Sequence, residues 1–216
     1  MVMKKSINVF ICFLFCATMA HAQDFPSQIW HQGKIFLTSG EVYTGKVKYD
    51  LETNIVQLQR GSIETYSATL VDHFEIFDEY YGGIRTFYSL PYAVNSDYEV
   101  PIFFELLVQG EEITLLCREY ITADSRGMYR SMYHPMYMNP MYGLPMMNSS
   151  RLAFDYYFLT DSEIEKYGQK KKELLKLMED KSDEMKLYIR KNRLSHDKRG
   201  DLLRITAYYN QLKEQS

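Results

Sequence analysis

Residues 101–120 read Pro-Ile-Phe-Phe-Glu-Leu-Leu-Val-Gln-Gly-Glu-Glu-Ile-Thr-Leu-Leu-Cys-Arg-Glu-Tyr, two apolar strands joined at Gln109-Gly110-Glu111. Apolar side chains occupy both faces of the first strand and return on both faces of the second. A strand that is apolar on both faces is covered on both faces. The stretch therefore predicts a hairpin inside a sheet, with plainer strands around it and other elements packed on it.

The chain before this hairpin has the pattern of further strands. Residues 34–50 alternate apolar and polar positions about the turn Ser39-Gly40-Glu41, and Gly82-Gly83 marks another hairpin. Strand candidates recur with turn signals between them, which is typical of antiparallel sheets. The pattern predicts a meandering sheet, either a sandwich or an open barrel, and periodicity does not choose between them. Further strands are expected at residues 56–58, 63–66, 73–77, 84–90 and 151–160.

The end of the chain changes to a helical period. From Gln169 onward apolar residues recur three and four positions apart, and the last seam is Leu202, Ile205, Tyr209 and Leu212. That seam is shorter than a coiled coil needs, so we expect it to pack on its own domain. The fold class predicted is α+β, with a β domain at residues 23–160 and a helical tail at residues 161–216 packed on it. Thr160-Asp161-Ser162-Glu163 has capping-box spacing, while Gly168 indicates that the piece following this motif is short or is itself extended.

Residues 1–22 have the three parts of a secretory signal peptide. Lys4 and Lys5 precede an apolar run at residues 7–15, and Ala20-His21-Ala22 forms a small-residue cleavage site. The run is too short to span a bilayer. We expect cleavage before Gln23, an exported chain that is periplasmic or associated with the outer membrane, and no transmembrane segment in the mature part.

Charge and cysteine content narrow the function classes. Residues 23–160 carry 9 basic and 17 acidic side chains, and residues 161–216 carry 14 and 11. An acidic exported chain is a poor candidate for nucleic-acid binding. Cys12 and Cys16 leave with the signal, so Cys117 has no intramolecular disulfide partner and stability must come from a core.

Glu105 is the charged residue that stands out in the apolar hairpin. A two-residue turn at Gly110-Glu111 would put Glu105 opposite Leu116 and diagonal to Arg118 on one face. The chemical interpretation is a carboxylate held for acid–base work. The structural interpretation, an ion pair in an apolar face, is favoured because no second acid or histidine is placed nearby by sequence.

Residues 127–149 form an insert rich in methionine and tyrosine. It holds seven of the 12 methionines and three of the six prolines, and the prolines oppose both helix and strand. Thioethers with an imidazole suit Cu(I), so a copper site is one hypothesis; the other is a flexible insert that contacts a partner. The candidate ligands within residues 128–147 are Met128, Met132, His134, Met136, Met138 and Met141.

Several motifs resemble a group of uncharacterised exported β-rich proteins of Gram-negative bacteria. The resemblance spans nearly the whole mature chain and implies a location and an architecture, with no assigned activity. The residues that carry it are Gly33-Lys34-Ile35, Ser39-Gly40-Glu41, Gly45-Lys46-Val47, Phe103-Phe104-Glu105 with Gly110, Lys186-Leu187-Tyr188-Ile189-Arg190-Lys191-Asn192 and Tyr208-Tyr209-Asn210.

No catalytic or cofactor signature occurs in the sequence. There is no nucleophile elbow, zinc helix or phosphate loop. Cys117 and His73 would make a thiol dyad only if the fold joined them, and a cysteine among leucines is a buried, inert thiol. The sequence therefore predicts a non-catalytic envelope protein that binds another protein or an envelope component. The alternative is a copper-binding protein that uses the insert.

Overall fold

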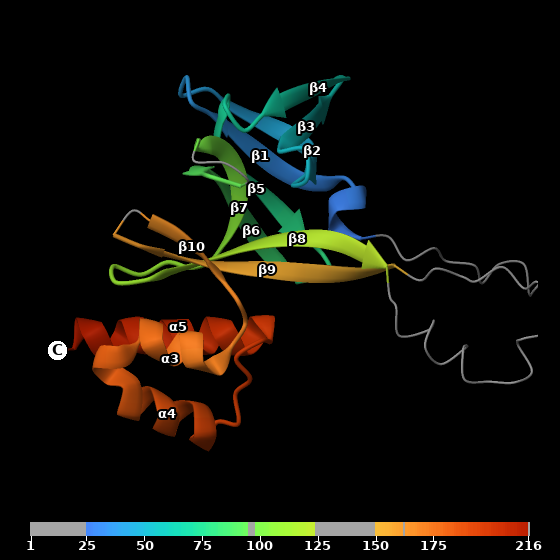
Figure 1. Ribbon diagram of the computed structural model, residues 1–216. Helices are drawn as coiled ribbons and strands as arrows, with labels where there is room; N and C mark the ends of the chain where they lie inside the picture. Colours follow the sequence, from blue (N-terminus) through green and yellow to red (C-terminus); the bar gives the residue numbers. More distant parts are fainter. Residues whose placement is uncertain (1–24, 95–97, 124–149, 162, 216) are drawn as a thin grey trace, which may run out of the picture.

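The computed structural model describes residues 25–94, 98–123, 150–161 and 163–215 (Figure 1). A short 3-10 helix comes first in the described part, ten strands follow, and helices end it. The elements are η1 (Pro26–Gln28), β1 (His31–Leu37), β2 (Val42–Asp50), β3 (Ile55–Arg60), β4 (Ser62–Ser67), β5 (Val71–Asp78), β6 (Gly83–Tyr92), β7 (Val100–Val108), β8 (Thr114–Ala123), β9 (Ser150–Thr160), β10 (Glu163–Tyr167), α3 (Lys171–Leu177), η3 (Glu179–Lys181), α4 (Ser182–Lys191) and α5 (Arg199–Glu214).

The ten strands form one continuous antiparallel sheet. Its order is β10-β9-β8-β7-β6-β5-β1-β2-β3-β4, so neighbours in sequence are neighbours in space except where β5 returns to pair with β1. The described strands thus make a single sheet and not the two sheets of a sandwich. Together with the helices that follow, this confirms the predicted α+β class.

The sheet curls so strongly that distant strands face each other (Figure 1). The Tyr49 hydroxyl on β2 donates to a carboxylate oxygen of Glu119 on β8, although four strands lie between β2 and β8 in the sheet. Within the curl, Gly45 of β2 lies so close to the neighbouring strand β3 that a Cβ there would be 2.8 Å from the Gln59 carbonyl oxygen. The curl encloses a core, here called the sheet core, of Ile35, Val47, Tyr49, Leu51, Val56, Leu58, Ala68, Val71, Phe74, Ile76, Phe87 and Phe103.

The β7–β8 hairpin is buried on both faces, as the sequence predicts. Phe103 enters the sheet core, while Ile102 and Phe104 pack on the opposite face with Leu116 and Tyr157. The hairpin lies inside the sheet, with two strands beyond β8 and six beyond β7. The apolar side chains on each face of the hairpin are therefore covered by other parts of the protein.

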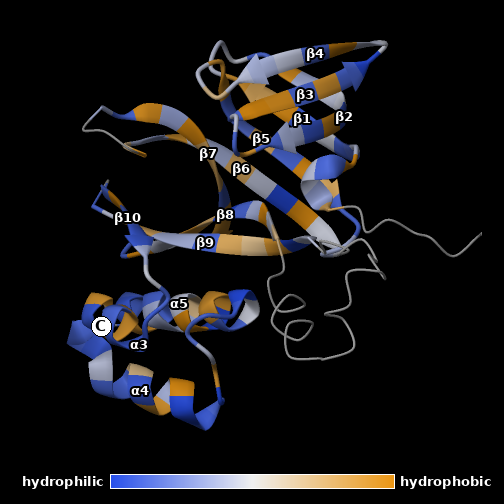
Figure 2. Cartoon of the chain, turned by 45° about the vertical axis from the view of Figure 1, so that its right-hand side comes forward, coloured by the Kyte–Doolittle hydropathy of each residue, from blue (hydrophilic) through white to orange (hydrophobic). Residues whose placement is uncertain are grey.

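The three described α-helices form a layer beside the β8–β9 part of the sheet, with α3 and α5 nearer to the strands than α4 (Figures 1 and 2). They bury the apolar faces that the sequence predicts, including Leu202, Ile205 and Tyr209 of α5. The helical tail therefore packs on its own domain. We call this second cluster the helix core; it comprises Ile113, Leu115, Cys117, Tyr156, Phe158, Tyr167, Leu174, Met178, Met185, Ile189, Leu194, Leu202, Ile205 and Tyr209.

One boundary differs from the prediction, because the sheet extends past residue 160 into the predicted helical tail. Residues after the Thr160-Asp161-Ser162-Glu163 motif continue the sheet as β10, because Tyr167 enters the helix core and Ile164 the opposite face. In the described part of the chain, no helix has the length and apolar content needed to cross a membrane.

Candidate functional site

Arg85 of β6 is the centre of a buried charge network. Side chains alternate along β6, so Arg85 shares the inward face with Phe87 of the sheet core and is only 4% exposed. A guanidinium removed from water must find partners for all of its donors or the fold loses several kcal/mol. The surrounding strands supply these partners.

All five N–H groups of Arg85 donate hydrogen bonds. Nε and Nη2 form a bidentate pair with Glu105 at 2.7 and 2.8 Å. The second Nη2 hydrogen is directed to Glu119 at 2.8 Å, and Nη1 donates to Asp78 at 2.8 Å and to the Tyr49 hydroxyl at 3.0 Å. This uses the full donor capacity of the guanidinium. Arg85 thus joins residues from β2, β5, β7 and β8.

The helical layer contributes a second arginine. Arg199, the first residue of α5, donates to both oxygens of Glu105 at 3.0 and 2.5 Å. The ring of Tyr81 lies 4.9 Å from the guanidinium carbons of both Arg85 and Arg199. Glu105 is therefore clamped between two guanidiniums, one from the sheet and one from a helix.

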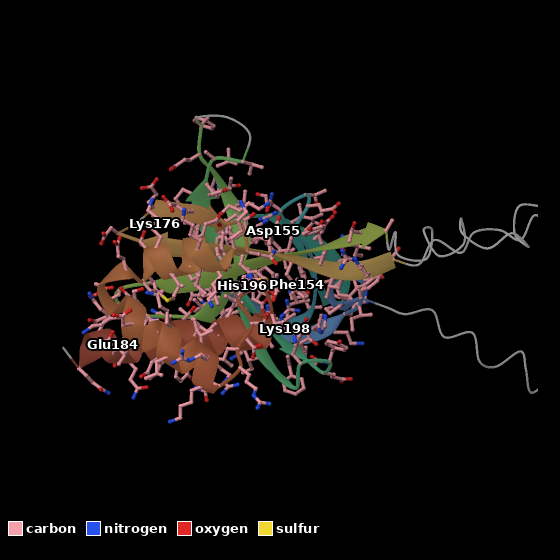
Figure 3. The ribbon with its side chains drawn as sticks, turned by 60° about the horizontal axis from the view of Figure 1, so that its bottom comes forward. Phe154, Asp155, Lys176, Glu184, His196 and Lys198 are labelled. Atoms are coloured by element: carbon pink, nitrogen blue, oxygen red, sulfur yellow. The ribbon has the colours of Figure 1, made fainter. Side chains whose placement is uncertain are left out.

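The α4–α5 connection, residues 192–198, contacts the sheet at its C-terminal end. His196 and Lys198 belong to this connection and Phe154 to β9, and all three are labelled in Figure 3. The carbonyl oxygen of His196 accepts a hydrogen bond from the Tyr167 hydroxyl at 3.0 Å. Arg199 follows directly and lies 5.6 Å from the centre of the Phe154 ring. The connection thus delivers Arg199 to Glu105.

The electrostatics of the network favour an ionised Glu105 and a neutral Tyr49. Burial acts to raise the pKa of Glu105, but its hydrogen bonds and charge attraction to Arg85 and Arg199 outweigh it and lower the pKa overall. Burial, reinforced by the neighbouring carboxylates, raises the pKa of Tyr49 well above its usual value. Burial likewise raises the pKa of Tyr81 to about 12. Tyr49 therefore acts as a hydrogen-bond donor to Glu119.

A pocket of about 560 Å³ lies where η1, the β2–β3 hairpin and the end of β8 meet. Tyr49 and Glu119 belong to both the buried network and the pocket lining, so the network supports one wall. The lining residues are Ser27, Gln28, Lys48, Tyr49, Asp50, Leu51, Glu52, Ile55, Gln57, Glu119, Tyr120 and Ile121.

Several polar groups of this pocket have no partner within the described chain. The side chains of Lys48 and Gln57, which are directly paired across β2 and β3, make no hydrogen bond or ion pair with other described residues. Asp50 uses one oxygen to accept from the backbone N–H groups of Glu52 and Thr53 at 2.8 and 3.2 Å. Hydrogen-bonding capacity therefore remains at the lining.

The predicted pairing of Glu105 with Arg118 is wrong. Glu105 pairs with Cys117 in the ladder, one residue away from the predicted Leu116. A slip of one residue moves every side chain to the other face, so Glu105 shares its face with Cys117 and Glu119 while Arg118 lies on the opposite one. The ion-pair interpretation of Glu105 is right in kind, but its partners are Arg85 and Arg199.

Arg118 instead fixes the β2–β3 turn against the sheet. Its Nη1 donates to the side-chain oxygen of Asn54 at 3.0 Å and to the Phe103 carbonyl at 2.7 Å, and its Nη2 donates to the Leu51 carbonyl. Asn54 also accepts from the Phe103 N–H at 3.3 Å. Arg118 therefore holds one side of the curl that places the pocket.

The other candidate residues are not brought together. Cys117 is fully buried in the helix core, and burial raises the pKa of its thiol. His73 stacks between Phe36 and Tyr88 and bonds to Asp72. The proposed copper ligands Met128, Met132, His134, Met136, Met138 and Met141 lie outside the described residues. A Cu(I) titration of the chain with and without residues 128–147 tests that hypothesis, which stays a prediction.

Sequence reasoning missed Arg85, Asp78 and Glu119 as a group. The usable signal was their strand parity: Arg85 shares a face with Phe87, and Glu119 shares one with Cys117 and Leu115. Opposite charges at inward positions of neighbouring strands indicate a buried network. Placing Glu105 on the correct face required the strand register. The two-residue turn assumed from the sequence gave a register that was wrong by one residue.

Together these features define an α+β protein in which a curled antiparallel sheet encloses an arginine–carboxylate network beside an open pocket. No protein-family model, curated protein or solved structure matches the chain. The resemblance to exported proteins of Gram-negative bacteria therefore stays a prediction.

Proposed function

We propose that the chain is a non-catalytic exported protein that binds a small ligand in the pocket at the β2–β3 hairpin. The observation that carries this is the contrast between paired and unpaired groups at one wall. Tyr49 and Glu119 are engaged by Arg85, whereas Lys48 and Gln57 have no side-chain partner in the described residues. Pockets of a few hundred Å³ with a few convergent polar groups are the usual form of ligand sites.

The chemistry of the buried groups supports binding over catalysis. A general base needs a pKa near the working pH, but two guanidiniums lower the pKa of Glu105 and leave it a weak base. A nucleophilic cysteine needs a lowered pKa and access to solvent. Burial raises the pKa of the Cys117 thiol and removes it from solvent. These side chains are suited to holding the fold.

Export is the second part of the proposal and rests on the signal features in residues 1–22. Expression of the full chain in a Gram-negative host, followed by intact mass measurement of the periplasmic and membrane fractions, tests it. The expected product begins at Gln23. A chain of uncleaved mass confined to the cytoplasm would remove the envelope role.

A ligand screen with a blocked pocket tests the binding function. Gln57→Trp fills the pocket from a half-buried position, and Gln59→Trp places the same ring two residues on, at an exposed position that does not line it. We expect at least one compound of a small-metabolite library to raise the melting temperature of the wild type and of Gln59→Trp but not of Gln57→Trp. A library in which no compound makes this distinction would count against the proposal.

A further inference from the structure

The pocket lining includes two oppositely charged residues of β2, Lys48 and Asp50. Lys48 and Asp50 stand at alternate positions of β2, so their side chains leave the same face of the strand about 7 Å apart. Both residues are half-buried, and Glu52 adds a second carboxylate at the turn. The lining therefore offers a cation for an anionic group and carboxylates for a cationic group.

These groups have capacity left for a ligand. The Lys48 ammonium has no acceptor among the described side chains. One Asp50 oxygen holds the turn, and the other accepts no hydrogen bond from a described residue. Groups removed partly from water are stabilised when a partner satisfies them.

Part of the remaining lining is apolar. Leu51 and Ile55 border the pocket at the β2–β3 turn, and Tyr120 and Ile121 border it from β8. Tyr120 is 38% exposed, so its ring is accessible. A ligand bound by Lys48 and Asp50 would pack its apolar part against these side chains.

We propose that the pocket binds a dipeptide with free termini and an apolar side chain, its carboxylate at Lys48 and its ammonium at Asp50. An extended dipeptide spans about 7 Å, which matches the separation of the two charged positions. A nucleotide or another polyanion would be repelled by Asp50 and Glu52, and a polyamine by Lys48. A zwitterion carries one charge for Lys48 and one for Asp50. This inference rests on the proposed binding function.

Matched peptides and variants separate the two contacts. The probes are Leu-Leu, N-acetyl-Leu-Leu and Leu-Leu-amide, titrated calorimetrically into the full mature chain. Lys48→Met removes the cation. Asp50→Asn removes the charge and keeps the oxygen that holds the turn. Lys46→Met changes the neighbouring lysine on the same face of β2, which does not line the pocket.

We expect Leu-Leu to bind the wild type and Lys46→Met equally, with each blocked peptide about tenfold weaker. Lys48→Met should weaken the binding of Leu-Leu about tenfold and leave the binding of Leu-Leu-amide unchanged. Asp50→Asn should also weaken the binding of Leu-Leu about tenfold and leave the binding of N-acetyl-Leu-Leu unchanged. Absence of Leu-Leu binding, or equal effects of Lys48→Met and Lys46→Met, would overturn the inference.

The two proposals fail in different ways. A compound that distinguishes Gln57→Trp from Gln59→Trp while no peptide binds overturns the peptide inference and leaves the binding function standing. Absence of any such compound, peptides included, overturns both.

Discussion

Arg85 is held in an apolar interior only because four other side chains satisfy it. The acceptors around it match the five donors of a planar, forked guanidinium, and no other side chain has this set of donors. The Tyr49 hydroxyl completes the set because it accepts from Arg85 and donates to Glu119. The network is therefore sensitive to geometry as well as to charge.

Arg85→Lys should lower the free energy of unfolding by about 3 kcal/mol although the charge is kept. Lysine has three donors and cannot meet Glu105, Glu119 and Asp78 in their present positions, so buried carboxylates lose partners. Urea unfolding at pH 7 measures the change. A loss below about 0.5 kcal/mol would show that the network tolerates a point charge.

Tyr49→Phe should cost about 1–3 kcal/mol, because Arg85 and Glu119 each lose one hydrogen bond inside the protein. Tyr43→Phe, on the same strand and outside the network, is the control. Thermal unfolding of both variants checks this prediction. Equal melting temperatures would mean that water replaces the hydroxyl.

At the scale of elements, the β7–β8 connection shows how a helix sets strand register. Residues 109–113 form the loop, because Ile113 is buried in the helix core and leaves the ladder. Asn210 of α5 donates to the Ile113 carbonyl at 2.9 Å and accepts from its N–H at 3.3 Å. Gly110 has no positive φ; its missing side chain makes room for Asn210.

Gly110→Ala should destabilise the protein by about 1–3 kcal/mol, since the new Cβ would overlap the Asn210 side chain. In an Asn210→Ala background the same change should cost much less, which gives a measurable coupling energy. Gln211→Ala, exposed on the same helix, is the neutral control. An identical cost of Gly110→Ala in both backgrounds would point to backbone strain in place of steric contact.

At the scale of the whole molecule, Arg199 fastens the helical layer to the sheet. A cation at the first residue of a helix is opposed by the helix dipole, so its position there is explained by the two hydrogen bonds to Glu105. The same carboxylate pairs with Arg85 inside the sheet. Glu105 thus links the sheet core to the helical layer.

This link predicts a pH-dependent stability. The pKa of Glu105 is lower in the folded than in the unfolded chain, so its contribution is present above the unfolded pKa of about 4.3 and is lost as pH falls through the folded pKa. Arg199→Met should lower stability at pH 7 by about 2 kcal/mol. The difference from wild type should shrink below about pH 4.

Urea unfolding between pH 3 and 7 measures this difference. Arg204→Met, exposed on the same helix, controls for the loss of one positive charge. Parallel curves for wild type and Arg199→Met over the whole range would separate the docking of α5 from the ionisation of Glu105.

The sequence by itself determined the class of fold. Alternating side chains fixed the strands, and three- and four-residue spacing fixed the helical faces at Leu202, Ile205 and Tyr209, because these periods follow from local backbone geometry. Only the tertiary structure decided the register at Glu105, its partners 20 and 94 residues away, and the pocket. The curl of the sheet and the docking of α5 bring those groups together, and local periodicity carries no record of either.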